Sequence, residues 1–502
     1  MTLTAELSSE FQSKAVAEDL PKIIQGGMGV GISRWQLARA VGQLECLGVV
    51  SGTAIEVVHA RTLGLGDPGG HLLRAYSHFP DQELVQRVLG RWYIKGGKSP
   101  KARFKSVPMF KVESSKWLLE LTVLANFGEV WLAKEDNPSP VGINYLEKIH
   151  IPTAPSIYGA ILGGVDAVTM GAGIPAKIPD LIRSLSRGKP VTYSVPVEGS
   201  EAEFARVNFD PCKIVSAPPK NLKIPAFLAI VSSHVLAIYL AKDQETIPDG
   251  FIVEAPSAGG HNAPPRGRLS LDEAGQPIYG DRDNPDLKKI KELGLPFWLA
   301  GTRASPEAIA ESLEQGAKGV QIGTAFALCK ESGMEPNLRH KLFMKAVEGD
   351  LTVMTDPVAS PSGYPFKVAN MEGTLSEDEI LNSRQRKCDL GYLRVLARAD
   401  SGVLVMRCPS EEEQLYEAKG GAIENTVGRK CLCNGLLATA GFGQIREVPG
   451  GTYVEPPIVT IGDDVVRIAK TIGEKIDPDG SCEVYSASDL VKYLLTEPNQ
   501  EK

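Results

Sequence analysis

The sequence predicts an eight-stranded parallel (β/α)8 barrel, and three observations support this fold class. Short apolar segments that end in glycine or polar residues recur eight times by residue 325. Amphipathic stretches lie between several of them, and strands that alternate with helices form a parallel sheet. The chain has 502 residues with 43% hydrophobic side chains, so it can bury a large core. An open, doubly wound α/β sheet is the alternative.

The eight predicted strands share a run of apolar, often β-branched residues. They cover residues 22–28, 47–53, 141–147, 167–174, 226–234, 250–256, 296–302 and 319–325. Helical spacing predicts helices over 33–42, 178–188, 235–243 and 305–316. Ser33 and Ser305 are the expected N-caps of the first and last of these helices, and Pro306 fits a first helical position.

Two regions of the chain are not needed for an eight-stranded barrel and are expected to form additional structure. Residues 54–140 separate the second and third strands, and helical patterns at 71–79, 82–93 and 115–135 predict a helical insertion there. Residues 331–502 follow the eighth strand and are expected to form a C-terminal subdomain. The barrel is therefore expected within residues 1–330.

Composition argues against several classes of protein. The net charge of −7 does not suit a nucleic-acid-binding protein. The first 20 residues lack the apolar core of a signal peptide. The longest uncharged apolar run, residues 226–241, is shorter than the roughly 20 residues that cross a membrane. We expect this run to form a strand, a turn and a buried helix, and the protein to be cytoplasmic with no membrane or nucleic-acid partner.

Glycines gather near the predicted strand ends, which meet at the barrel rim where active sites form. They are Gly26, Gly27, Gly29, Gly52, Gly171, Gly173, Gly259, Gly260, Gly301 and Gly323. This concentration predicts a planar cofactor that lies against backbone, with its phosphate at the loops after strands seven and eight. The segment Gly171–Ala176 also matches G-x-G-x-x-A. Pro175 interrupts it and no acidic strand end follows, which disfavours a dinucleotide-binding fold.

A single histidine follows the sixth predicted strand. This strand leads through Glu254 and Ser257 into Ala258-Gly259-Gly260-His261. Consecutive glycines let the backbone approach a flat or anionic ligand. An imidazole that titrates near pH 6.5 can act as a base or as a hydrogen-bond donor. His261 is therefore the candidate catalytic residue.

Five segments together resemble the nitronate monooxygenase family, formerly called 2-nitropropane dioxygenases, which is related to flavin-dependent enoyl-acyl-carrier-protein reductases. They are IIQGGMGVGIS, VTMGAGIP, VEAPSAGGHNAPPRG, FWLAGTRASPEAIAESLEQGAKGVQIGTAFALCKES and SPSGYPFKV. The resemblance implies an FMN-binding TIM barrel that acts on a small-molecule substrate, with NAD(P)H as a co-substrate in the reductase case.

The resemblance also implies which residues form the site. His261 corresponds to the histidine at the flavin, and Asn144 to an asparagine of the third strand near it. The other implied cofactor-binding residues lie in four places. They are Gln25, Gly26, Gly27 and Met28 in the first-strand loop beside the isoalloxazine ring, Ala258, Gly259 and Gly260 on the face beside the histidine, Gly171 at the end of the fourth strand, and Gly301, Gly323 and Thr324 in the phosphate loops. Two segments depart from the family. AGTRA stands where a Gly-Gly pair is usual, and QGGMG lacks a proline before the methionine.

Three functions follow as alternatives. The leading hypothesis is FMN-dependent oxidation of alkyl nitronates with O₂, in which His261 holds the nitronate or removes the α-proton of a nitroalkane. The first alternative is an NAD(P)H-dependent enoyl-(acyl-carrier-protein) or quinone reductase, with an acyl-carrier protein as a partner and His261 as a donor. The second alternative is a flavin-binding partner protein whose C-terminal region docks another protein.

Half of the eight cysteines fall close together in the C-terminal region. Cys388, Cys408, Cys431 and Cys433 could in principle bind Zn²⁺ or an iron–sulfur cluster. Their only close pair is C-x-C, and buried free cysteines often behave as small apolar residues. We therefore favour unligated thiols and expect no metal.

Overall fold

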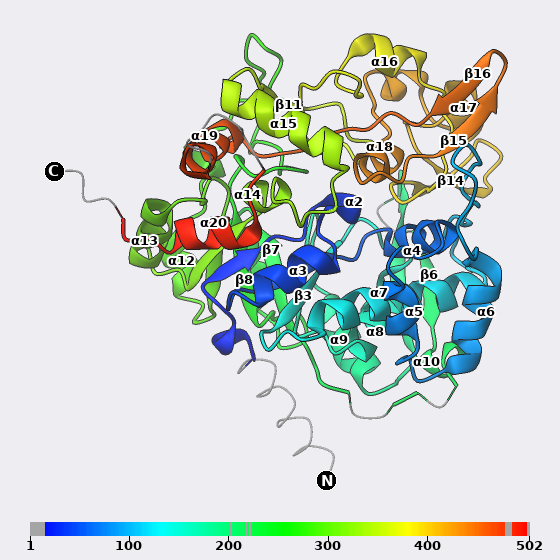
Figure 1. Cartoon of the computed structure of the whole chain (residues 1–502), viewed down its shortest axis with the longest axis horizontal. Helices are drawn as coiled ribbons and strands as arrows, with labels where there is room; N and C mark the ends of the chain where they lie inside the picture. The colour runs from blue at the N-terminus through cyan, green and yellow to red at the C-terminus, as the bar shows by residue number, and fades with distance from the viewer. Residues whose placement is uncertain (1–15, 201–202, 217, 220–221, 477–483, 499–502) are drawn as a thin grey trace.

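The computed structural model describes residues 16–200, 203–216, 218–219, 222–476 and 484–498. Its central sheet has eight parallel strands in the order β1-β10-β9-β8-β7-β4-β3-β2 (Figure 1). The strands are β1 Ile23–Gln25, β2 Gly48–Ser51, β3 Val141–Leu146, β4 Ala167–Gly171, β7 Ala226–Val231, β8 Gly250–Glu254, β9 Phe297–Ala300 and β10 Gly319–Ile322. All eight predicted strands are confirmed, each slightly shorter than expected.

The sheet closes into a barrel between β1 and β2. The backbone N–H of Gln25 donates to Leu47 O at 2.9 Å, and the N–H of Leu47 donates to Ile23 O at 3.0 Å. The Gln25 side chain adds a link, because its Oε1 accepts from the N–H of Val49 at 3.1 Å. A closed barrel excludes the open sheet, and with it the dinucleotide-binding alternative.

One end of the barrel interior is filled by side chains. Ile24, Val49, Leu228, Ile252 and Trp298 belong to a buried cluster that also contains Ala17 and Leu20, which precede β1. The Trp298 indole donates to Pro21 O at 3.0 Å, which places this cluster at the N-terminal ends of the strands. The opposite rim, at the C-terminal strand ends, is the one that can carry a site.

Helices cover the outside of the sheet, so the strands are buried on both faces and read as continuous apolar runs. These helices are α3 Trp35–Gly42, α7 Lys116–Lys134, α8 Thr153–Leu162, α9 Ile178–Ser186, α11 His234–Ala241, α12 Leu287–Lys291, α13 Pro306–Glu314 and α14 Thr324–Ala327. The N-cap prediction for Ser305 is confirmed, since its Oγ accepts from the N–H of Ala308 at 3.2 Å. The N-cap prediction for Ser33 is wrong, because Arg34 precedes α3 and the Ser33 hydroxyl binds elsewhere.

Helix α11 is less buried than predicted. Val235 and Tyr239 are 65% and 57% exposed, so the expectation of a buried helix is wrong. The helix is apolar on all sides, and its sequence therefore gives no sign of which face meets solvent. Within the described residues, no helix is both long and apolar enough to span a bilayer.

The insertion between β2 and β3 is helical, as predicted. It contains α4 Ile55–Gly64, α5 His71–Tyr76 and α6 Gln82–Trp92, and it leads into α7. A fully buried network ties it to the barrel: His59 Nε2 lies 2.7 Å from Glu129 Oε2, and His59 Nδ1 lies 2.8 Å from the Tyr76 hydroxyl. Glu129 also accepts from the N–H of Trp35 at 2.7 Å, which fixes the start of α3.

A hairpin that the sequence did not predict lies between β4 and β7. It is formed by β5 Val191–Glu198 and β6 Phe204–Phe209, and α10 Pro211–Ile214 follows it. Its partner is β13 Val395–Arg398, which pairs in parallel with β5 and in antiparallel with β14 Leu404–Arg407. The result is a second sheet of order β14-β13-β5-β6 outside the barrel.

The residues after β10 pack on the barrel in two places. Their elements are α15 Pro336–Glu348, β11 Val353–Asp356, β12 Phe366–Ala369, α16 Asp378–Ser383, α17 Glu413–Ala418, α18 Leu432–Thr439, β15 Ile445–Val448, β16 Gly451–Val454, α19 Val465–Ile476 and α20 Ala487–Leu494. Figure 1 shows α16, α17, α18, β15 and β16 together on one side of the molecule. Helices α19 and α20 return to the barrel, where α19 packs on α15 and α20 on α3.

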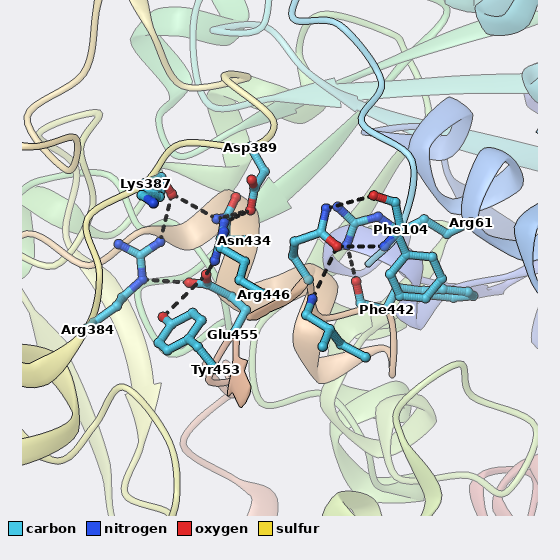
Figure 2. Close-up of polar contacts among 12 residues, drawn as sticks. Arg61, Phe104, Arg384, Lys387, Asp389, Asn434, Phe442, Arg446, Tyr453 and Glu455 are labelled. Carbon is cyan, nitrogen blue, oxygen red and sulfur yellow. Dashed lines mark hydrogen bonds and ion pairs between the residues drawn. The ribbon is translucent and has the colours of Figure 1, made fainter. Parts of the chain in front are cut away.

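Residues 384–464, called the capping region below, are fixed by buried ion pairs (Figure 2). Glu455 is fully buried and accepts from Arg384 Nε at 2.6 Å. Arg446 lies 3.2 Å from the same carboxylate and also binds Asp389. Asp389 in turn accepts from Asn434 Nδ2 of α18 at 2.9 Å. One carboxylate thus links the buried Arg384 to the partly buried Arg446, and the network reaches the helix that covers the barrel mouth.

A second set of contacts joins the capping region to the helical insertion (Figure 2). The Gln444 side chain accepts from the N–H of Phe104 at 2.8 Å and donates to its carbonyl at 3.2 Å. The Arg61 guanidinium donates to Phe442 O and lies over the Phe104 ring. The capping region is therefore held from two sides.

Candidate functional site

A cavity of about 230 Å³ opens at the C-terminal ends of the barrel strands. The predicted site residues that line it are Gly26, Gly27, Met28, Asn144, Gly171, Ala258, Gly259, Gly260, His261, Gly301, Gly323 and Thr324. The structure thus brings together every predicted site residue except Gln25. The capping region completes the wall with Tyr392, Leu393, Leu432, Cys433, Leu436, Thr439, Thr460, Ile461 and Asp464.

Gln25 supports the first-strand loop from behind. Its side chain is fully buried, and Nε2 donates to Ser33 Oγ at 2.9 Å and to Gly26 O. The Ser33 hydroxyl accepts from the N–H of Met28 at 2.9 Å and donates to Gly26 O at 3.1 Å. These bonds explain why Ser33 does not cap α3, and they fix the loop and the short helix α2 Gly29–Ile32 at the cavity.

Gly27 brings the loop into close contact with β3. A Cβ at this position would lie 2.3 Å from Asn144 Cβ, so no larger residue fits without displacement. Asn144 Nδ2 donates to Gly27 O at 3.1 Å, and its Oδ1 accepts from the Thr169 hydroxyl at 2.8 Å. Asn144 therefore holds the loop and is itself oriented by β4.

His261 is positioned by the segment quoted above as SPSGYPFKV. Its Nε2 lies 2.7 Å from Ser360 Oγ, which lies 2.7 Å from Ser362 Oγ. Its ring meets the Phe366 ring edge-on at a centroid distance of 4.8 Å. Burial, with a smaller contribution from the Lys148 ammonium, lowers the pKa of His261 to about 4. The imidazole is therefore neutral at physiological pH.

Glu254, the last residue of β8, places a carboxyl group in the cavity wall. Its side chain has no hydrogen-bond partner among the described residues. Burial raises the pKa of Glu254 to about 7. The carboxyl group is therefore close to half ionised at neutral pH.

The opposite part of the cavity is formed by the loops after β9 and β10. Gly301 and Thr302 are left-handed, with φ of 94° and 55°, and the Thr302 hydroxyl donates to Ser257 Oγ at 2.6 Å. Left-handed β-branched residues are strained and concentrate at ligand-binding loops. Arg303 follows and lines the cavity, and its Nε is buried without a hydrogen-bond partner within the described residues. A cavity lined by a guanidinium, by loop backbone and by Thr324 fits a phosphate ester.

A protein-family model matches the part of the chain that carries His261 and the loops after β9 and β10. Residues 213–383 match the model of the family described as nitronate monooxygenase. Over these residues the chain is similar to the nitronate monooxygenase family. The matched stretch contains His261, Glu254 and both predicted phosphate loops. The chain is therefore an oxidoreductase, and the family that it resembles generally uses flavin. No curated protein matches the chain.

Three solved structures are similar to this chain. A nitroalkane oxidase from Streptomyces ansochromogenes is 14% identical, with 96% of each chain covered and a TM-score of 0.45. FabK from Thermotoga maritima is 17% identical, with 73% of this chain and 76% of that chain covered and a TM-score of 0.40. The enoyl reductase domain of MlnA from the macrolactin biosynthesis cluster of Bacillus amyloliquefaciens is 12% identical, with coverages of 72% and 66% and a TM-score of 0.37.

The capping region adds residues to the site that sequence reasoning missed. Tyr392 lines the cavity, and its hydroxyl donates to Glu56, which lies buried at the start of α4. Burial raises the pKa of Glu56 to about 7. No spacing in the sequence indicates that residue 392 meets residue 56, because the pairing depends on how the capping region docks.

Four cysteines of the capping region lie near one another, and Cys433 lines the cavity. Burial raises the pKa of all four thiols, so they are protonated at neutral pH. Among the described residues, no group of three or more His, Cys, Asp or Glu is arranged to hold a metal ion. Cys482 lies outside the described residues.

Proposed function

We propose that the chain binds FMN at the barrel mouth and oxidises alkyl nitronates with O₂. One observation carries this proposal: a neutral histidine borders the same cavity as a guanidinium whose buried Nε has no hydrogen-bond partner among the described residues. Gly26, Gly27 and Met28 on one side and Ala258, Gly259 and Gly260 on another would hold the ring, and the loops at Gly301 and Gly323 would hold the phosphate. When bound, FMN accepts an electron pair from the substrate and passes it to O₂.

His261 would bind the nitronate oxygen. Ser362 can donate to Ser360, and Ser360 can then donate to His261 Nε2, which leaves the proton of the neutral ring on Nδ1. Nδ1 has no hydrogen-bond partner among the described residues, so it is available to donate to a ligand. An imidazole with a pKa near 4 is a weak base. We therefore expect a preformed nitronate to react faster than the neutral nitroalkane.

A second candidate is favoured by the apolar wall of the cavity. Met28, Ile32, Met334, Leu432 and Leu436 line it together. This wall would suit the hydrocarbon chain of an enoyl thioester, which supports an NAD(P)H-dependent enoyl or quinone reductase as the second candidate. An acyl-carrier protein would then be the partner, and His261 Nδ1 would donate to the thioester carbonyl.

Anaerobic reduction of the bound flavin separates the two candidates. We expect the purified protein to be yellow, to bleach with propyl-2-nitronate, and to consume O₂ when air is admitted. Bleaching by NADPH or NADH alone, followed by reoxidation with an enoyl thioester or a quinone, would favour the reductase. A yellow protein that neither a nitronate nor NAD(P)H bleaches would leave the second alternative, a flavin-binding partner protein. A colourless protein that takes up no FMN would contradict all three functions.

The carboxyl group of Glu254 should impose a pH dependence on nitronate binding. As the pH rises through about 7 this group loses its proton, and the new anion repels an anionic substrate. We expect KM for the nitronate to rise several-fold between about pH 6 and pH 8. In Glu254→Gln this rise should disappear, whereas Glu273→Gln, at an exposed position, should retain it. Oxygen consumption with preformed nitronate measures both, and an unchanged profile in Glu254→Gln would exclude this group.

A further inference from the structure

We infer that Arg303 binds the phosphate of FMN and makes the site select phosphorylated flavin over riboflavin. This inference rests on the proposed function and goes beyond it, because it assigns the cofactor's charge to one side chain. The backbone loops alone would favour any phosphate, whereas a guanidinium offers a full charge and paired donors.

The position of Arg303 follows from the turn after β9. The chain passes through left-handed residues at Gly301 and Thr302, and the Thr302 hydroxyl is bound to Ser257. A Cβ at Gly301 would lie 2.9 Å from Ser257 Oγ, so this turn packs closely against the loop after β8. Arg303 and Ala304 follow the turn and line the cavity beside Gly323 and Thr324.

The guanidinium of Arg303 is incompletely satisfied. Its Nε is buried and has no hydrogen-bond partner among the described residues, which is uncommon for a buried donor. Its ion pair with Glu311 is long, at 3.5 Å, and the Glu311 side chain is 59% exposed. A pair of this kind contributes little, so most of the charge remains available to a ligand.

The carboxylates that line the cavity make a cation necessary for binding a phosphate there. Glu254 and Asp464 both line the cavity, and their carboxylates would repel a phosphate dianion. Among the described residues that line the cavity, Arg303 is the single lysine or arginine. Arg303 is therefore the side-chain cation that these lining residues offer to a phosphate.

Binding of FMN and riboflavin to the full-length protein, freed of flavin and titrated by fluorescence quenching, tests this inference. The wild-type protein should bind FMN far more tightly than riboflavin. Arg303→Gln should weaken FMN binding by about 10- to 100-fold and change riboflavin binding by less than about twofold. Arg303→Lys, which keeps the charge, should lose less. Arg268→Gln removes the same charge from an exposed loop position and should leave both dissociation constants unchanged.

The outcomes separate this inference from the proposed function. A wild-type FMN preference that persists unchanged in Arg303→Gln would overturn the inference and leave FMN binding intact. Equal weakening of FMN and riboflavin would also overturn it, because it would show a structural role. If the wild-type protein binds neither flavin, the proposed function fails and the inference fails with it. A steeper loss of FMN affinity with salt in the wild type than in Arg303→Gln would support the assigned charge contact.

Discussion

Replacing His261 with alanine is expected to lower kcat/KM for the nitronate by about two to three orders of magnitude while the protein keeps its flavin. The change removes the Nδ1 donor that faces no protein partner among the described residues. It leaves the glycine loops and Arg303 in place. Ser360 and Phe366 contact the imidazole ring and orient it. We expect no neighbouring side chain to take over its hydrogen bond to the substrate.

Two measurements check this expectation together. Oxygen consumption gives turnover, and the visible flavin absorbance per chain shows whether the cofactor is retained. His340→Ala, at an exposed position on α15, is the matched control and should behave as the wild type. Unchanged turnover in His261→Ala would remove this residue from the reaction, and loss of flavin would give it a binding role instead.

The second large effect is expected from Glu455→Gln in the capping region. This change removes the carboxylate that both arginines contact, and it leaves Arg384 buried without its ion-pair partner, whereas Arg446 keeps Asp389. Removing one partner of a buried ion pair destabilises a protein by about 3–5 kcal/mol, since the remaining charge is uncompensated. The cost falls on residues 384–464, so this region should open more often while the barrel stays folded.

Amide hydrogen exchange resolves this local effect. Exchange within α18 and β15 should accelerate by about 100- to 1,000-fold in Glu455→Gln, and bound flavin should dissociate faster because α18 covers the cavity. Glu447→Gln removes an exposed carboxylate from β15 and should change neither quantity. Equal exchange in both variants would mean that the ion pairs do not hold the capping region.

The barrel was predictable because each of its strands carries a local signal. Segments such as 226–231 and 250–254 are buried on both faces, and a glycine or polar residue marks the end of each. Since parallel strand ends meet at one rim, residues as distant in sequence as Gly27 and His261 could be placed at one cavity. Gln25 was assigned to the cavity by the family resemblance, but its side chain points into the β1–β2 junction.

The rest of the site depends on contacts that no local pattern reveals. The hairpin β5–β6 finds its partner β13 almost 200 residues later, so its pairing has no local signal. Tyr392 and Cys433 reach the cavity only because the capping region docks on the insertion. Ser33 has the residue type of an N-cap, yet its hydroxyl is hydrogen-bonded to Gln25 and Met28 instead. In each of these cases the contacts are made with residues that no local sequence pattern identifies, so only the three-dimensional structure reveals them.

The enclosure of the cavity by both early and late parts of the chain has a consequence for biosynthesis. The loop at Gly26 leaves the ribosome more than 400 residues before Thr460 and Ile461, which touch the same cavity. A nascent barrel, complete once β10 has emerged, would therefore present an uncovered mouth until the capping region has followed it. We therefore expect a bound cofactor to be retained stably only after α18 and the segment that follows it have been synthesised and have docked on the barrel.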